Sequence, residues 1–198
     1  MRVLSVLLLL LLLGACSSVD RVYMKPGLLE NELRLVKRVS VAVDPGSVRA
    51  EDSDARNKIL QFRSREHLIH HSEYITYKGK EAASLLDACK LNPKLNGVIV
   101  QKVTRAEKSG SSLRLEMISG LYECKTGTLL WEAAASKSYT MNDSDFTTLV
   151  SGDARRFGDA ARAYSAPFYR MIKDLYERLP MPELADDEKL EKIEADSE

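Results

Sequence analysis

The feature that most constrains this chain is an apolar run near its start, Leu7 to Leu13, which Gly-Ala and then Cys16 follow directly. Arg2 supplies a positive charge ahead of the run. A short apolar segment with these flanks is typical of a secretory signal peptide, and it is too short for a membrane-spanning helix. We therefore expect residues 1–15 to be removed and the remainder of the chain to be exported.

The cysteine at the end of this run suggests a lipid anchor. The stretch Leu13 to Cys16 resembles the lipobox of bacterial lipoproteins, and the resemblance implies that Cys16 carries diacylglycerol on its sulfur and an acyl chain such as palmitate on its amine. Each buried methylene contributes about 0.8 kcal/mol, so several chains anchor a protein durably. Ser17 in place of Asp resembles the outer-membrane class. The alternative is an ordinary signal peptide with a chance cysteine beside it.

The charge distribution divides the mature chain into segments. The sequence has 29 basic and 29 acidic residues, without the basic excess that nucleic-acid binding requires. Eight acidic residues and two lysines fall between Met181 and the end. We expect a lipidated tether over 16–32, a single domain over 33–179 and a solvated acidic tail over 180–198.

Periodicity predicts an α+β domain. We expect strands over 33–43, 73–77, 97–103, 113–122 and 129–139, and helices over 54–71, 81–90 and 154–175. The last three strands are joined by short turns, which indicates an antiparallel meander. The prediction is a mixed sheet of about five strands that ends in this meander, with helices packed mainly on one face.

The last predicted helix has two notable features. Its apolar stripe stays in phase across Pro167, which favours one kinked helix. Four basic residues lie near one side, away from the stripe, and they either contact anionic lipid headgroups or an acidic partner, or form an ordinary solvated face. These residues are Arg155, Arg162, Arg170 and Lys173.

Two cysteines remain after lipidation, in an exported chain where disulfides persist. Cys89 closes the helix that leads into the strand at Gly97, and Cys124 ends the strand that returns beside it. Both thiols are thus expected near the same edge of the sheet, and a bridge there would contribute about 4 kcal/mol through loop closure. The alternative is two buried, inert thiols.

Candidate chemistry is sparse. His67, His70 and His71 cluster at a helix end, and His67 and His71 are spaced so that both can face one metal ion. The same cluster suits the negative end of a helix dipole, so a surface role is the alternative. The sequence has no nucleophile elbow, phosphate loop or dinucleotide fingerprint. We therefore predict no catalytic residue, metal or cofactor and no enzymatic activity.

Two segments carry a resemblance to a known family. The aliphatic strand Asn96 to Val100 and the segment Lys125 to Glu132, within 36–179, are similar to the envelope-lipoprotein domain of curli-secretion CsgG, the LpoB-type activators of peptidoglycan synthases and the N-terminal part of TolB. A small uncharacterised outer-membrane lipoprotein family has the same layout. The sequence departs from these relatives, because it lacks membrane-inserting hairpins and a long proline-rich segment.

The resemblance implies a function in binding or assembly. We expect a lipid-anchored outer-membrane protein, exposed to the periplasm, that binds an unidentified envelope protein and does not bind nucleic acid. Two alternatives stay open. One is a homo-oligomeric secretion component of the CsgG type, and the other is a metal-dependent binder or enzyme that uses the histidine cluster.

Overall fold

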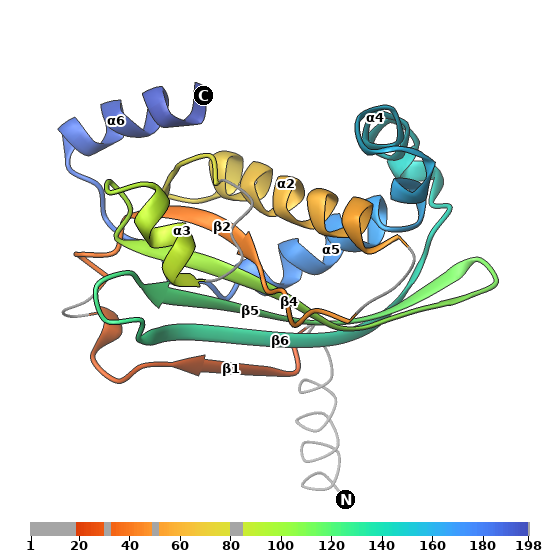
Figure 1. The fold of residues 1–198 in the computed structure, drawn as a ribbon, viewed down its shortest axis with the longest axis horizontal. Coiled ribbons are helices and arrows are strands. Elements are labelled where there is room, and N and C mark those ends of the chain that lie inside the picture. The colour runs from red at the N-terminus through yellow and green to blue at the C-terminus, as the bar shows by residue number, and fades with distance from the viewer. Residues whose placement is uncertain (1–18, 30–32, 49–51, 80–84, 198) are drawn as a thin grey trace, which may run out of the picture.

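A computed structural model describes residues 19–29, 33–48, 52–79 and 85–197. The signal peptide and Cys16 lie outside these ranges, so their assignment stays a prediction. The described chain forms one six-stranded sheet in the order β1-β6-β5-β4-β2-β3 (Figure 1). No helix in these ranges is long and apolar enough to span a bilayer.

The sheet is mixed, as the sequence predicts. Its strands are β1 (Arg21–Met24), β2 (Arg38–Val43), β3 (Ile75–Thr76), β4 (Gly97–Ser109), β5 (Ser112–Glu123) and β6 (Leu129–Thr140). The long strands β4, β5 and β6 form the antiparallel meander. On the other side β4 pairs with β2, and β2 with β3, both in parallel.

Helices cover mainly one face of the sheet. They are α2 (Ser53–His71), α3 (Leu85–Leu91), α4 (Thr147–Phe157), α5 (Ser165–Tyr176) and α6 (Asp186–Ser197). The core beneath α2 and α5 includes Val39, Val41 and Ile99. The smaller helix α3 packs against Ala42 and Val98, which point the opposite way because side chains alternate along a strand. Strand β2 is therefore buried on both faces, as befits a central strand.

A polar group of three residues lies inside the main core. The amide nitrogen Nε2 of Gln101 donates to the hydroxyl oxygens of Tyr176, at 2.5 Å, and of Ser119, at 3.0 Å. All three residues are buried, and burial raises the pKa of Tyr176, so this hydroxyl stays neutral. Their mutual hydrogen bonds offset part of the desolvation cost, although the side-chain oxygen of Gln101 has no partner among the described residues, and they fix α5 over β4 and β5.

The expected tether is partly folded. Residues Arg21–Met24 form strand β1, which pairs antiparallel with the start of β6, from Arg21 opposite Ala134 to Met24 opposite Trp131. Val19 and Leu28, on either side of the strand, are buried in the main core. The tether expected over 16–32 therefore contains a strand of the sheet at Arg21–Met24, which the sequence did not indicate because four residues are too few to produce a clear alternation.

The last predicted helix is not continuous. Helix α4 ends at Phe157, Gly158 follows with a φ of 87°, and a short 3-10 turn over 159–163 leads into α5. Glycine adopts this positive φ without steric cost. The helix therefore ends here, although the apolar stripe in the sequence continues in phase. Pro167 lies in the first turn of α5, where its missing N–H is tolerated. The break therefore lies at Gly158, and Pro167 does not kink a longer helix.

The acidic end of the chain folds back onto the sheet. Helix α6 packs against the edge strand β3, and Ala195 is only 3% exposed. Lys37 donates to Glu188 at 2.6 Å, and Arg38 donates to Glu191 at 2.5 and 2.8 Å. The tail expected over 180–198 is thus largely exposed but packs on the domain through α6, because its negative charges find basic partners just before and within β2.

Candidate functional site

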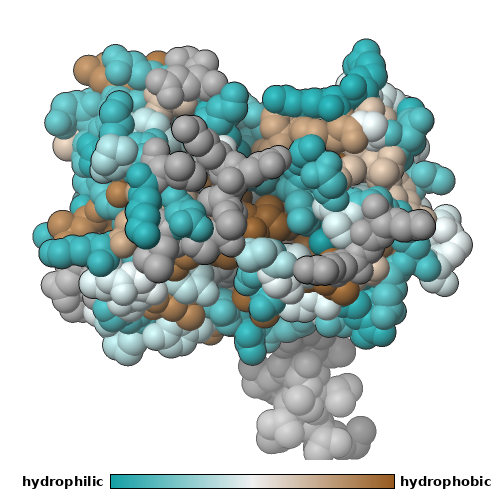
Figure 2. Space-filling model, viewed as in Figure 1, coloured by the Kyte–Doolittle hydropathy of each residue, from teal (hydrophilic) through white to brown (hydrophobic). Residues whose placement is uncertain are grey.

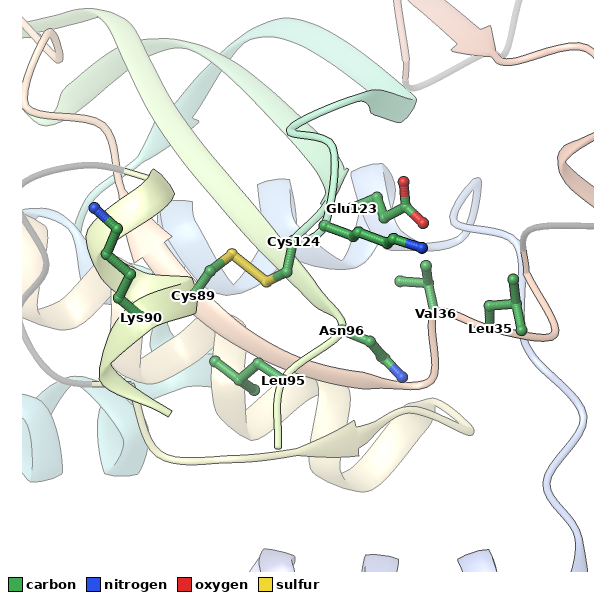
Figure 3. A pocket seen from close by; sticks show the side chains of 9 residues that line it. Leu35, Val36, Cys89, Lys90, Leu95, Asn96, Glu123 and Cys124 are labelled. Carbon is green, nitrogen blue, oxygen red and sulfur yellow. A yellow bond between two sulfur atoms is a disulfide. The ribbon is translucent and has the colours of Figure 1, made fainter. Parts of the chain in front are cut away.

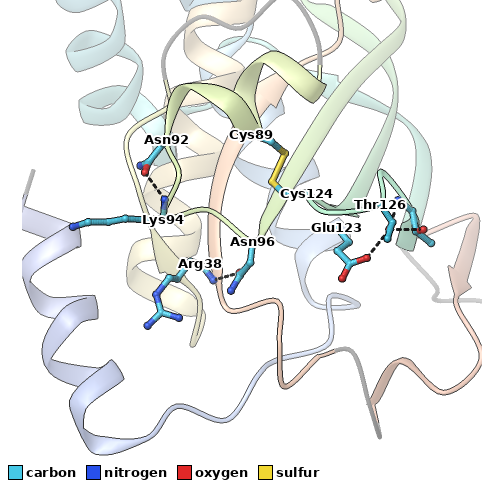
Figure 4. The surroundings of a disulfide bond; sticks show 9 residues. Arg38, Cys89, Asn92, Lys94, Asn96, Glu123, Cys124 and Thr126 are labelled. Carbon is cyan, nitrogen blue, oxygen red and sulfur yellow. Dashed lines mark hydrogen bonds between the residues drawn. A yellow bond between two sulfur atoms is a disulfide. The ribbon is translucent and has the colours of Figure 1, made fainter.

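The disulfide joins the two segments that the sequence predicted to meet (Figure 4). Cys89 of α3 is bonded to Cys124, which follows β5, with 5.5 Å between their Cα atoms. The intervening loop is held by Asn96, whose side-chain oxygen accepts from the backbone N–H groups of Lys37 and Arg38. The backbone N–H of Cys124 donates to the carbonyl of Asn96 at 3.0 Å. The bridge therefore fastens α3 to the end of the meander.

An open pocket of about 470 Å³ lies beside this disulfide (Figure 3). Its lining is mixed, with apolar side chains, an amide and charges of both signs: Leu35, Val36, Cys89, Lys90, Leu95, Asn96, Glu123, Cys124 and Lys125. Glu123 accepts a hydrogen bond from Thr126. The pocket has a suitable size for a small ligand, but its chemistry selects no ligand class.

A second pocket, of about 300 Å³, has a far more selective lining. It is formed by residues from β2, α2, α4 and the segment after β3: Val41, Lys58, Gln61, Phe62, Arg65, Lys78, Gly79, Arg156 and Phe157. We call it the basic pocket, because four of these nine side chains are cationic and none is a carboxylate. Such a lining attracts anions, and its two phenylalanines add apolar wall.

Aromatic contacts set the shape of the basic pocket. The rings of Phe62 and Phe157 lie 5.5 Å apart. The guanidinium of Arg156 lies 4.2 Å from the centre of the Phe62 ring and 5.5 Å from that of Phe157. Stacking on a ring orients a guanidinium and leaves its N–H groups free to bind a carboxylate or phosphate. Arg156 is therefore presented to an incoming anion.

The other wall of the pocket is closely packed. Gln61 donates to the carbonyl of Val41 at 2.8 Å, which fixes α2 against β2. A Cβ atom on Gly79 would lie 2.8 Å from the same carbonyl oxygen, so this position accepts only glycine. The close approach of the backbone at Gly79 places Lys78 beside Gln61 in the pocket wall.

The four cations differ in how far they are neutralised. Lys58 pairs with Asp54 at 2.8 Å, and one N–H of Arg65 reaches the carbonyl of Ala195 at 3.4 Å. Lys78 has no ion pair or hydrogen bond within the described chain, and Arg156 contacts only aromatic rings there. Lys78 and Arg156 are thus the residues that an acidic ligand would neutralise. Sequence reasoning missed this pocket because its cations come from separate segments.

The basic residues that the sequence singled out on the last helix do not form one surface. Arg162 pairs with Asp159, Arg170 with Asp143, and Lys173 with Glu177. Arg155 is exposed on α4. The break at Gly158 separates Arg155 from the others, so the predicted cationic side is interrupted and partly neutralised.

The histidine cluster lies at the C-terminal end of α2. His67 packs between His71, with ring centres 4.7 Å apart, and Tyr176, at 5.5 Å. Burial, with help from His71 and Lys173, lowers the pKa of His67 to about 4. Within the described ranges, no three His, Cys, Asp or Glu side chains are grouped as metal ligands. The contacts therefore account for His67 as a neutral packing residue.

Comparisons with known proteins give only distant similarities. No protein-family model matches the sequence, and no curated protein matches it. Among solved structures, the PelC dodecamer of Paraburkholderia phytofirmans has a TM-score of 0.48 and 11% identity, over 78% of this chain and 95% of that one. Lipoprotein GNA1162 of Neisseria meningitidis has a TM-score of 0.37 and 17% identity, over 60% and 96%. Because these TM-scores are below 0.5, we derive no function from them.

Proposed function

We propose that this chain is a lipid-anchored protein of the cell envelope, held in the outer membrane by Cys16, whose domain binds a partner protein in the periplasm. The anchor rests on the leucine run and the Leu-Gly-Ala-Cys sequence. The disulfide between Cys89 and Cys124 fits an oxidising compartment, in which such bonds persist. A domain similar to that of CsgG, LpoB and TolB is part of this proposal.

The basic pocket is the main observation that supports a binding function. Four cations and two phenylalanine rings surround about 300 Å³, and no carboxylate is among the lining residues that the structure describes. This chemistry suits an acidic segment of a protein that also carries an apolar side chain. Lys78 and Arg156 would bind the carboxylates, and Phe62 and Phe157 would pack against the apolar group.

We propose binding without catalysis because the two buried groups Asp153 and Tyr176 are engaged in contacts that hold the fold together. Asp153, 1% exposed, receives two hydrogen bonds from Arg63, at 2.5 and 3.0 Å, which join α2 to α4. Tyr176 is held by Gln101 in the core. A catalytic group usually combines a shifted pKa with access to a cleft, whereas these groups are engaged in packing.

The test is a crosslinking experiment in intact cells, followed by detergent extraction and mass spectrometry. The parent chain is compared with Lys78→Glu, Arg156→Glu and Cys16→Ala variants. Arg155→Glu is the matched control, because it makes the same charge change on the neighbouring exposed residue outside the pocket. We expect one envelope protein to be recovered with the parent and with Arg155→Glu, and to be lost with both pocket variants.

The outcomes separate the parts of the proposal. Recovery that is unchanged in Lys78→Glu and Arg156→Glu would contradict the pocket as the binding site. Recovery of the parent chain without lipid on Cys16 in the mass spectra would contradict the lipid anchor. Self-crosslinks of one large, defined size would favour the alternative of an oligomeric secretion component.

A further inference from the structure

Strand β1 and the turn after it expose an unusual number of apolar side chains. Val22 is 47% exposed, Tyr23 46%, Met24 39% and Leu29 59%. Three of the four are consecutive and lie on the outermost strand of the sheet. Figure 2 shows hydrophobic residues between hydrophilic ones on the side of the molecule that carries β1. Several exposed apolar side chains on one edge strand indicate a contact with something outside the domain.

The position of this edge in the chain identifies what it contacts. Val19 is 5% exposed in the core, and the N–H of Asp20 donates to the carbonyl of Ala134 at 2.8 Å. Only three residue steps separate Val19 from Cys16, and three extended residues span at most about 11 Å. A lipid on Cys16 therefore holds the first buried residue of the domain within about 11 Å of the anchored cysteine. That distance leaves no room for a free tether.

We propose that the edge formed by Val22, Tyr23, Met24 and Leu29 lies directly on the membrane surface, so that the lipid and this edge together fix the orientation of the domain. This inference rests on the lipidation of Cys16 in the proposed function. Tyrosine is suited to the interface, where its ring contacts acyl chains and its hydroxyl contacts headgroups. Arg21, at one end of the strand, pairs with Glu132 at 2.9 Å, and its side chain remains 64% exposed beside the same headgroups.

The backbone limits how deeply the edge is inserted. The N–H of Lys25 donates to the carbonyl of Leu130. Because hydrogen-bonded pairs alternate along an antiparallel ladder, the polar backbone groups of Val22 and Met24 point away from the sheet. In the hydrocarbon region these groups would lack partners, whereas headgroups and water supply them. The edge therefore lies at headgroup level and does not enter the hydrocarbon core.

The experiment uses the full lipidated protein in vesicles of phosphatidylethanolamine and phosphatidylglycerol that contain a lipid with a nitroxide on its headgroup. All variants carry Trp131→Phe, so that the introduced residue is the only tryptophan. Tyr23→Trp then places the fluorophore on the edge, and Val22→Trp repeats the measurement from the other side of the strand. Ile193→Trp is the control, because Ile193 is 68% exposed on α6 at the opposite end of the sheet. Flotation of each sample on a density gradient reports anchoring independently.

We expect all samples to float with the vesicles, and the nitroxide to quench the tryptophan at position 23 or 22 several-fold more than that at position 193. Flotation with equal quenching at the three positions would overturn the membrane contact and leave the anchor intact. Failure to float would overturn the lipidation itself. A blue-shifted but unquenched signal from position 23 would also overturn the inference, because it would show that a second copy of the chain covers the edge.

Discussion

Glu191→Gln is the substitution that most directly tests how the acidic end of the chain is held. Glu191 accepts hydrogen bonds from Arg38, at 2.5 and 2.8 Å, and from the hydroxyl of Tyr77 at 2.5 Å. The hydrogen bonds from Arg38 are the main reason that the pKa of Glu191 falls from 4.5 to about 2, although burial acts in the opposite direction. Glutamine keeps the shape and removes the charge.

The size of the effect follows from this shift in pKa. Each pKa unit corresponds to about 1.4 kcal/mol, which sets an upper limit of about 3 kcal/mol. The side chain is 28% exposed, so solvent screening reduces the expected loss to about 1–2 kcal/mol at pH 7. The pKa is lower in the folded state, so this contribution is complete above pH 4.5 and disappears as the pH falls toward 2.

The assay is urea denaturation of the parent and of Glu191→Gln at pH 7, 4 and 2, with Asp187→Asn as a control for the same charge change on an exposed part of α6. We expect the difference between parent and Glu191→Gln to shrink steadily from pH 7 to pH 2, and Asp187→Asn to change little. A difference that is the same at pH 2 and pH 7, or that is absent at pH 7, would refute the reasoning.

Three further predictions concern the disulfide, a close contact and a histidine. Replacing both Cys89 and Cys124 by alanine opens a loop with a sequence separation of 35, and should lower the free energy of unfolding by about 4 kcal/mol; calorimetry of oxidised and reduced parent gives the comparison. Gly97→Ala places a Cβ 2.4 Å from Val36, so we expect a loss of about 1–3 kcal/mol in urea denaturation, partly recovered by Val36→Ala. The pKa of His67 is lowered from 6.5 to about 4, chiefly by burial, so the parent should lose stability as the pH falls from 6.5 to 4, and His67→Gln should lose less; equal slopes would contradict this.

The sequence predicts those parts of the fold in which local pattern and tertiary contacts agree. The meander is an example, because its strands alternate clearly and are joined by short turns containing Gly110 and Gly127, both with positive φ. The meeting of Cys89 and Cys124 follows from the same register, since Gly97 lies opposite Glu123. Here the direction of two neighbouring strands is enough to place both thiols.

The parts that the sequence does not predict are stabilised by distant partners. Strand β1 has only four residues, and its partner β6 lies about 110 positions later in the chain, as the pair Arg21 and Ala134 illustrates. Helix α6 has an acidic, polar surface, and its position depends on Lys37 and Arg38, which a local pattern cannot connect with it. The basic pocket is the extreme case, because Lys78 and Arg156 are brought together only by the complete fold.

The sheet links the two proposals through its strand order. The basic pocket includes Val41 of β2, which is separated from β1 by β6, β5 and β4. Neighbouring strands are about 4.8 Å apart, so the pocket lies about 19 Å from the edge that we place on the membrane. With the sheet upright on the proposed membrane edge, the basic pocket lies outside the bilayer. In that proposed orientation, its acidic ligand would be a segment that projects into the periplasm, and an anionic lipid would not reach it. Lys78→Glu should therefore abolish partner binding without changing membrane contact, and Tyr23→Glu should weaken membrane contact without changing the pocket.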